Sequence, residues 1–92
     1  MYKITQYSYD QAKQLNVNIK ASKTKNKKID VFDKDGTKLA SIGDTRYKDY
    51  PSYILEKGIT YANERRRLYK IRHKIDLNKI GSTGYFANKI LW

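Results

Sequence analysis

The 92-residue sequence has no cysteine, and it contains one proline, one histidine and one tryptophan. Without cysteine there can be neither disulfide bonds nor thiolate metal sites, a composition typical of a reducing compartment. No apolar run approaches the roughly 18 residues that a membrane-spanning helix needs, and no signal peptide or lipidation motif is visible. We therefore expect one soluble intracellular domain, residues 1–92, that does not enter a membrane.

Acidic residues are also scarce, because nine Asp and Glu face twenty Lys and Arg and leave a formal net charge of +11. Self-repulsion at this charge costs stability, so a polyanionic partner is the natural explanation. The excess is concentrated in two segments. Residues 20–28 hold five lysines and no acid, and residues 61–80 hold seven Lys or Arg with two acids. This concentration indicates a binding surface rather than general solubility.

The first half of the chain combines one helix with short strands. Ser8 is a plausible N-cap for a helix that extends to about Leu15, with its apolar side facing the core. A polar, lysine-rich loop is expected at residues 20–28. The segment 29–43 has the clearest β pattern, two strands that flank a turn in which Gly36 suits a positive φ.

The second half of the chain is predicted to be helical. Pro51 suits the first turn of a short helix that Gly58 ends. Thr60 can then cap a long helix over about residues 61–77. After Gly81, the last residues form a further short helix with aromatic and aliphatic anchors.

The long helix carries apolar and basic side chains on opposite faces. At 100° per residue, four apolar residues form a stripe that should face the core: Tyr61, Leu68, Ile71 and Ile75. The opposite arc contains only basic groups: Arg66, Arg67, Lys70, His73 and Lys74. A solvated helix face usually mixes charges of both signs, whereas this arc contains no acid. We therefore expect these five side chains to be exposed and to contact nucleic-acid phosphates.

Three other charged residues of this helix do not belong to the arc. Arg65 and Arg72 lie beside the apolar stripe, so they should pack or pair at the core margin, Arg72 with Asp76. Glu64 falls within the stripe and needs a cationic partner from another element. A structural ion pair is the favoured interpretation, and a catalytic carboxylate is the alternative.

Two further groups of residues are candidate phosphate contacts. The lysine-rich loop offers a flexible second contact through Lys23, Lys25, Lys27 and Lys28, although exposed loops favour lysine in any case. Arg46 and Lys48 lie among three tyrosines, of which at least one could stack on a base or bond to a phosphate. Most of the nine tyrosines are expected to fill the core with a polar tip at the surface.

No catalytic or cofactor site can be assembled with any specificity. Asp33, Asp35 and Gly36 faintly resemble a calcium loop, but a hairpin turn explains them better. A metal-dependent nuclease would have to use His73 with Glu64 and Asp44, and no spacing supports it. The amides of residues 81–84 lead into a helix and could hold one phosphate. We therefore expect a binding protein rather than an enzyme, with no metal or cofactor.

Four segments, in this order, carry a resemblance to a known family: KIDVFDKDGTKLASIGD, RYKDYPSYI, YANERRRLYKIRHKIDL and GSTGYFANKILW. Together they cover nearly the whole chain, and they resemble a family of small basic proteins from large double-stranded DNA viruses, both giant and algal viruses. The family is described mainly as a domain of unknown function. The resemblance implies a viral protein in the virion and in the host-cell cytoplasm or nucleus (the viral factory), acting on or near the genome. It brings no catalytic residues.

These observations predict an α+β domain in which a small antiparallel, hairpin-based sheet packs against the long basic helix, with short flanking helices. The expected function is DNA binding through phosphates, largely without sequence preference, in genome condensation or packaging. RNA stays open as a partner, because phosphate contacts hardly distinguish the two. The alternative is a module that binds an acidic viral or host protein. A homodimer would double the basic surface, but nothing in the sequence demands one.

Overall fold

The computed structural model describes residues 2–92, which form a three-stranded antiparallel sheet and four α-helices. The elements follow the order α1 (Gln6–Gln14), β1 (Asn18–Ala21), β2 (Lys27–Phe32), β3 (Lys38–Asp44), α2 (Tyr50–Lys57), α3 (Ile59–Arg72), the 3₁₀-helix η1 (Lys74–Asn78) and α4 (Thr83–Ile90). The strands lie in the order β1-β2-β3. The predicted α+β class with an antiparallel, hairpin-based sheet is confirmed.

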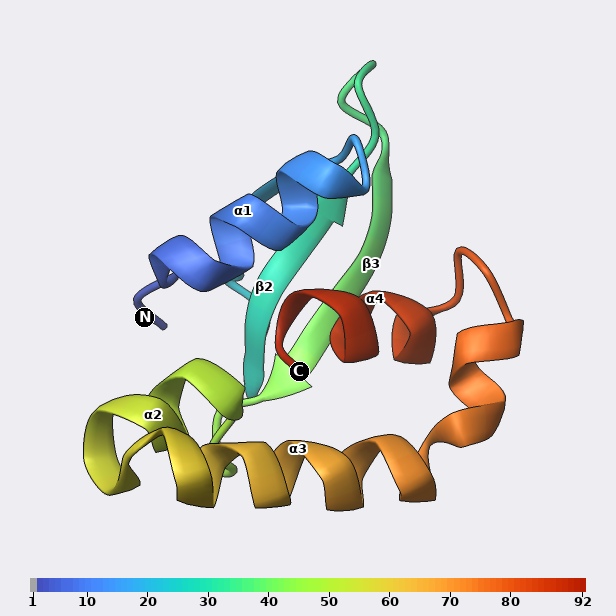
Figure 1. Cartoon of the computed structure of the whole chain (residues 1–92). Coiled ribbons are helices and arrows are strands. Elements are labelled where there is room, and N and C mark those ends of the chain that lie inside the picture. Colours follow the sequence, from blue (N-terminus) through green and yellow to red (C-terminus); the bar gives the residue numbers. More distant parts are fainter. Residues whose placement is uncertain (1) are drawn as a thin grey trace.

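The core lies between the sheet and two helices. Figure 1 shows α1 and α4 in front of the sheet, with α2 and α3 below it. The core cluster takes residues from α1, all three strands, α4 and the residue after it: Ala12, Ile19, Ile29, Val31, Ala40, Ile42, Phe86, Ile90 and Leu91. The Ser8 hydroxyl donates to the Ile90 carbonyl over 2.9 Å, which joins α1 to α4 inside the core.

The first helix begins earlier than the sequence predicts. Thr5, not Ser8, is its N-cap, and the Thr5 side chain accepts a hydrogen bond from the Ser8 amide. Ser8 is instead fully buried, so its hydroxyl serves tertiary packing. Ala12 faces the core as expected, and the helix stops where Asn16 takes a left-handed φ of 60°.

The β2–β3 hairpin confirms the clearest β prediction. Gly36 has a φ of +87°, and the Asp33 carboxylate accepts hydrogen bonds from the amides of Asp35 and Thr37 at 2.9 and 2.8 Å. These bonds account for the aspartates as turn residues. The lysine-rich loop predicted at 20–28 is shorter than expected, because β1 extends to Ala21 and β2 begins at Lys27.

The helix pair α2–α3 follows from local capping. Asp49 caps α2 by accepting a hydrogen bond from the Ser52 amide at 3.0 Å, and Pro51 occupies the first turn as predicted. Gly58, with a φ of +90°, ends α2, and α3 starts at the next residue, so Thr60 is not a cap. The long helix is also shorter than expected. It ends at Arg72, and the chain continues as η1, which α4 contacts.

The orientation of α3 is opposite to the prediction. The expected apolar stripe faces solvent, with exposed fractions of 46% for Tyr61, 38% for Leu68, 60% for Ile71 and 64% for Ile75. The one fully buried residue of α3 is Ala62, whose small side chain lets α2 and α3 approach closely. The aromatic and basic residues on that side of α3 are half-buried against α2, α4 and the C-terminal residues.

Candidate nucleic-acid interface

Aromatic and carbonyl partners explain why α3 turns its basic side inward. The Arg66 guanidinium lies 4.1 Å from the centre of the Tyr50 ring, a close cation–π contact. Lys70 Nζ donates to the side-chain and backbone carbonyl oxygens of Asn88 at 2.8 and 3.3 Å, near the C-terminus of α4, where a cation is favoured. Long basic side chains bury their aliphatic stems while their charged ends remain bonded.

This packing has a cost for the Lys70 charge. Burial lowers the pKa of Lys70 below its ordinary value, and the nearby charges of Arg66 and Lys89 lower it further. Arg66 and Lys70 therefore belong to the inner side of α3. The expectation that both are freely exposed is wrong, because each is half-buried and has a partner within the fold.

Several of the other predicted cations have acidic partners. Arg67 forms an exposed ion pair with Glu64 one turn earlier on α3. Glu64 therefore does form the expected structural ion pair, but on the same helix and outside the core. The remaining pairs of this kind are Arg46–Asp44, Lys48–Glu56 and His73–Asp76. Asp76 contacts His73 rather than the expected Arg72, which forms no ion pair within residues 2–92.

Lys28 is the clearest correction to the predicted set. Its Nζ lies 2.8 Å from Asp49 Oδ2, and both side chains are almost completely buried. Asp49 also accepts a hydrogen bond from the Tyr2 hydroxyl at 2.7 Å. Burial alone would raise the pKa of Asp49, but the hydrogen bond and charge of Lys28, with the Ser52 and Tyr2 hydrogen bonds, hold it below its ordinary value. Lys28 is therefore a buried partner of Asp49 and not the flexible, exposed loop cation that the sequence predicts.

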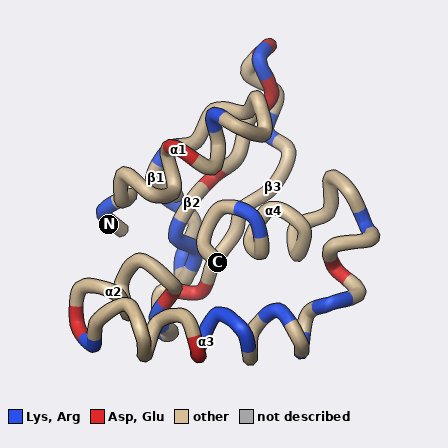
Figure 2. The backbone as a smooth tube through the Cα atoms, in the orientation of Figure 1, with Lys and Arg blue, Asp and Glu red and all other residues tan. Residues whose placement is uncertain are grey.

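Only part of the predicted set is both exposed and without an ion pair among the described residues: Lys23, Lys25 and Lys74. Lys27 is half-buried and lies opposite Asp44 in the β2–β3 register. The loop that carries Lys23 and Lys25 touches the β3–α2 connection, since the Thr45 amide donates to the Asn26 carbonyl over 3.1 Å. Figure 2 shows Lys and Arg gathered at this end of the sheet and along α3.

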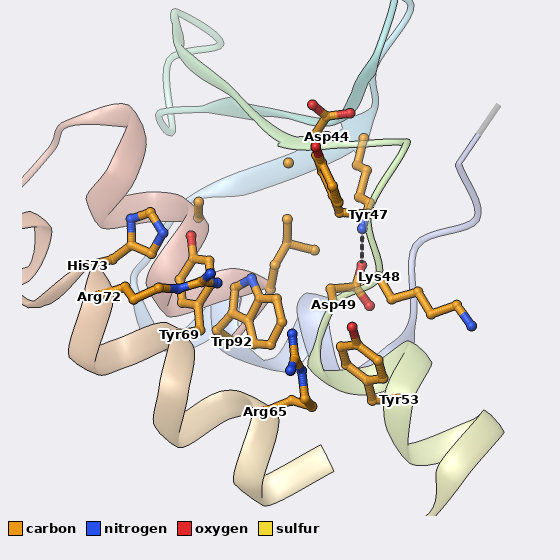
Figure 3. Close-up of a pocket in the computed structure, with 14 residues that line it drawn as sticks. Asp44, Tyr47, Lys48, Asp49, Tyr53, Arg65, Tyr69, Arg72, His73 and Trp92 are labelled. Atoms are coloured by element: carbon orange, nitrogen blue, oxygen red, sulfur yellow. Dashed lines mark hydrogen bonds and ion pairs between the residues drawn. The ribbon is translucent and has the colours of Figure 1, made fainter. Parts of the chain in front are cut away.

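A pocket of about 660 Å³ opens beside this end of the sheet. Side chains from α3, the β3–α2 connection, α2 and the C-terminal residues surround it (Figure 3). Its cationic and aromatic lining consists of Lys28, Lys48, Arg65, Arg72, His73, Tyr47, Tyr53, Tyr69 and Trp92. Two carboxylates, those of Asp44 and Asp49, also line it. Four Lys and Arg against these two acids leave the lining positive.

Stacked rings form one wall of the pocket. Tyr69 lies between Trp92, with ring centres 4.2 Å apart and planes 7° from parallel, and His73 at 4.3 Å. Tyr53 contacts Trp92 at a ring separation of 6.2 Å. Burial raises the pKa of the Tyr69 hydroxyl, and the charge of Asp76 raises it further, so this tyrosine stays neutral.

The two carboxylates of the pocket are already neutralised. Hydrogen bonds from the Arg46 side chain and backbone amide lower the pKa of Asp44 to about 2. Asp49 is held by Lys28 in the same way. Arg65, in contrast to these paired carboxylates, keeps an unsatisfied polar atom. Its Nε is buried and has no hydrogen-bond partner within the part of the chain that the structure describes. A buried donor without a partner is costly, so a ligand oxygen that reached it would supply a hydrogen bond that the fold does not.

Two of the lining residues were predicted to be structural. Arg65 and Arg72 were expected to pack at the core margin, yet both line the pocket. A helical wheel places Arg65 and Arg72 one above the other, at 40° and 20°, near Tyr69 at 80°. This shared face is the sequence feature that could have indicated the pocket. The tyrosine-rich loop was recognised as a possible ligand contact, and Tyr47 and Tyr53 do line the pocket.

No protein-family model, curated protein or solved structure matches the chain. The resemblance to proteins of large DNA viruses therefore stays a prediction. Within residues 2–92, no helix is long and apolar enough to cross a bilayer. The same residues contain no group of three or more His, Asp or Glu side chains arranged to hold a metal ion.

Proposed function

We propose that the chain binds nucleic acid through its phosphates, largely without sequence preference, and that its partner is the DNA of a large double-stranded DNA virus. The observation that carries this proposal is the position of the unpaired cations. Lys23 and Lys25 lie on a loop that touches the β3–α2 connection, beside the pocket into which Arg65 and Arg72 project. The β3–α2 connection therefore contacts the lysine-bearing loop and also lines the pocket that Arg65 and Arg72 line.

Charge of this kind has a measurable signature. If about five phosphates are engaged, log affinity for duplex DNA falls against log salt concentration with a slope near −4.5, since each phosphate contributes about −0.9. Condensing or packaging a genome needs this sequence-independent contact. RNA remains a possible ligand, because the same contacts recognise its backbone.

The test uses two charge-matched double variants. Replacing Lys23 and Lys25 with alanine should reduce the salt slope by about 1.8 and weaken duplex binding. The control replaces Lys13 and Lys34, two exposed lysines that lie together at the opposite end of the sheet. Equal loss of affinity in the two variants would show that net charge, and not this surface, controls binding. Absence of duplex binding at 50 mM salt would refute the proposed function.

A second copy of the chain is the partner that we propose for the exposed apolar face of α3. Tyr61, Leu68 and Ile71 are large apolar residues on this face, and the Glu64–Arg67 pair lies among them. In an antiparallel pairing of two α3 helices across a twofold axis, Glu64 of one copy faces Arg67 of the other, and Tyr61 faces Ile71. This arrangement is self-complementary in charge and in apolar surface, and it would double the basic surface. Sedimentation at several concentrations tests it.

An acidic protein partner is the rival class. It would use the same cations, so competition separates the two: a nucleic-acid binder prefers duplex over an unrelated acidic polymer of equal charge. A nuclease finds less support, since Glu64 does not line the pocket and is paired with Arg67. Magnesium-dependent cleavage that is lost in Glu64→Gln would contradict our proposal of a binding protein without catalysis.

A further inference from the structure

The pocket beside α3 has features that phosphate contacts along a duplex leave unexplained. Its volume of about 660 Å³ falls within the range of about 300–1,000 Å³ that small-molecule sites occupy. Aromatic rings line it together with cations, whereas a surface that only neutralises a duplex backbone needs no aromatic wall. The combination indicates a ligand with both a negative group and a flat ring.

Arg65 and Arg72 provide the anion-binding part. They are seven residues apart on α3, about two helical turns, so they lie on the same face of the helix. Figure 3 shows both side chains reaching from α3 into the pocket, toward Trp92. Arg72 forms no ion pair with any of the described residues, and Arg65 Nε has no hydrogen-bond partner among them. Guanidinium groups with free donors bind phosphate oxygens in a bidentate way.

Aromatic side chains provide the flat surface for a ring. Tyr47 is 70% exposed and lines the pocket with Tyr53 and Trp92. Tyr53 is close enough to Trp92 to form a continuous aromatic wall, and the Arg65 guanidinium lies 5.7 Å from the centre of the Tyr53 ring. Stacking on such rings suits any nucleobase, since every base has a π-face.

We propose that this pocket binds one nucleotide unit of a single-stranded nucleic acid, with the phosphate held by Arg65 and Arg72 and the base stacked on the aromatic wall. The inference rests on the proposed nucleic-acid binding and deepens it. A base within a duplex is paired and stacked, so it cannot enter a pocket without being extruded. Single strands, strand ends and unwound segments can present a base directly. The duplex would be held by exposed cations outside the pocket, among them Lys23, Lys25 and Lys74.

Trp92 is the single tryptophan of the chain and lines the pocket, so its fluorescence reports directly on occupancy. The probes are thymidine 5′-monophosphate, thymidine, a twelve-nucleotide thymidine strand and a duplex of mixed sequence. We expect a saturable fluorescence change with the monophosphate and with the single strand. Thymidine should bind at least tenfold more weakly than its monophosphate, and the duplex should leave the emission unchanged.

Arg72→Gln tests the phosphate contact, and Arg67→Gln is its control. Both residues are exposed and on α3, and both substitutions remove one positive charge, but Arg67 lies outside the pocket and pairs with Glu64. Arg72→Gln should weaken monophosphate binding at least tenfold, whereas Arg67→Gln should change it less than about twofold. Because Arg72 is exposed, the substitution should leave folding intact, which circular dichroism verifies.

The outcomes separate this inference from the proposed function. If neither monophosphate nor single strand changes the Trp92 emission, or if the two arginine variants lose affinity equally, the pocket is not a nucleotide site. Duplex binding measured by anisotropy would then still support the general function. Binding of the monophosphate without the strand would identify free nucleotides as the ligand and overturn the single-strand assignment. If neither duplex nor single strand binds at low salt, both proposals fail.

Discussion

Replacing Lys28 with methionine should strongly destabilise the fold. From the sequence alone, Lys28 is instead one of four loop lysines predicted to contact DNA phosphates. Methionine keeps most of the unbranched apolar stem but removes the ammonium group that lies 2.8 Å from Asp49 Oδ2. The side chains of the two partners are only 5% and 1% exposed. Asp49 would then be a buried carboxylate with hydrogen bonds from Tyr2 and Ser52 but without a counter-charge.

The expected magnitude follows from this burial. Removing one partner of a buried ion pair costs about 3–5 kcal/mol, because the remaining charge is left uncompensated. A domain of this length has a total stability of about 5–14 kcal/mol, so the loss is a large part of it. At about 4–8 °C per kcal/mol, the melting temperature should fall by at least about 12 °C.

Urea unfolding followed by circular dichroism measures the effect, and Lys25→Met is the matched control. Lys25 is exposed in the β1–β2 loop, so its substitution should change stability by less than about 0.5 kcal/mol. DNA binding should show the opposite pattern. Lys25→Met should reduce the salt slope by about 0.9, while Lys28→Met, measured where it is folded, should leave the slope unchanged.

A second substitution tests the cause of the destabilisation. Asp49→Asn in the Lys28→Met background removes the unpaired charge, so the double variant should be more stable than Lys28→Met alone. The reasoning is refuted if Lys28→Met costs less than about 1 kcal/mol at pH 7. It is equally refuted if the double variant shows no recovery, because the unpaired carboxylate would then not be the cause.

Other predictions concern acid stability, backbone strain and self-association. Asp49 has a folded-state pKa below its unfolded value of about 3.9. Its contribution to stability is therefore complete above about pH 5 and is lost as the pH falls through the folded pKa, which acid titration of wild type and Asp49→Asn checks. Gly43→Ala should destabilise more than Gly36→Ala: both glycines have positive φ, but a Cβ at Gly43 would lie 2.7 Å from Leu91 Cδ1, whereas Gly36 has open space. Thermal melts of the two variants measure the difference, and equal losses would contradict the close contact. Ile71→Glu should abolish a concentration-dependent dimer, which sedimentation measures. Because the Ile71 side chain is 60% exposed in the monomer, thermal melts should show no fall in the melting temperature of the monomer.

Local chemistry made several elements readable from the sequence. A glycine at the αL position of a hairpin turn, a proline in the first turn of a helix and a glycine after its last turn each act within a few residues of the chain. For this reason the β2–β3 hairpin around Gly36, and the helix between Pro51 and Gly58, agree with prediction. The β pattern of residues 29–43 likewise predicts a strand pair, because side chains of a strand point to alternate faces of the sheet whatever the rest of the chain does.

Partners that are distant in the sequence decided the rest. The helical wheel identified two faces of α3 but could not say which one packs, because the choice depends on Tyr50, Asn88 and Trp92 as neighbours. Cation–π contacts, ring stacking and carbonyl acceptors made the basic face the inner one and left the apolar stripe in solvent. The pocket could not be predicted for the same reason, since four separate segments of the chain form it.

Net charge, composition and the positions of turns and caps are properties of the chain itself. They determined that this is a basic α+β domain, and they predict a polyanionic partner. Which cations remain available is a property of the fold. Lys23 and Lys28 are equivalent in composition and lie five residues apart, yet one is exposed and the other is buried against Asp49. The difference arises because a lysine loses its availability when the fold places a carboxylate beside it in a buried position, and only tertiary packing can do so.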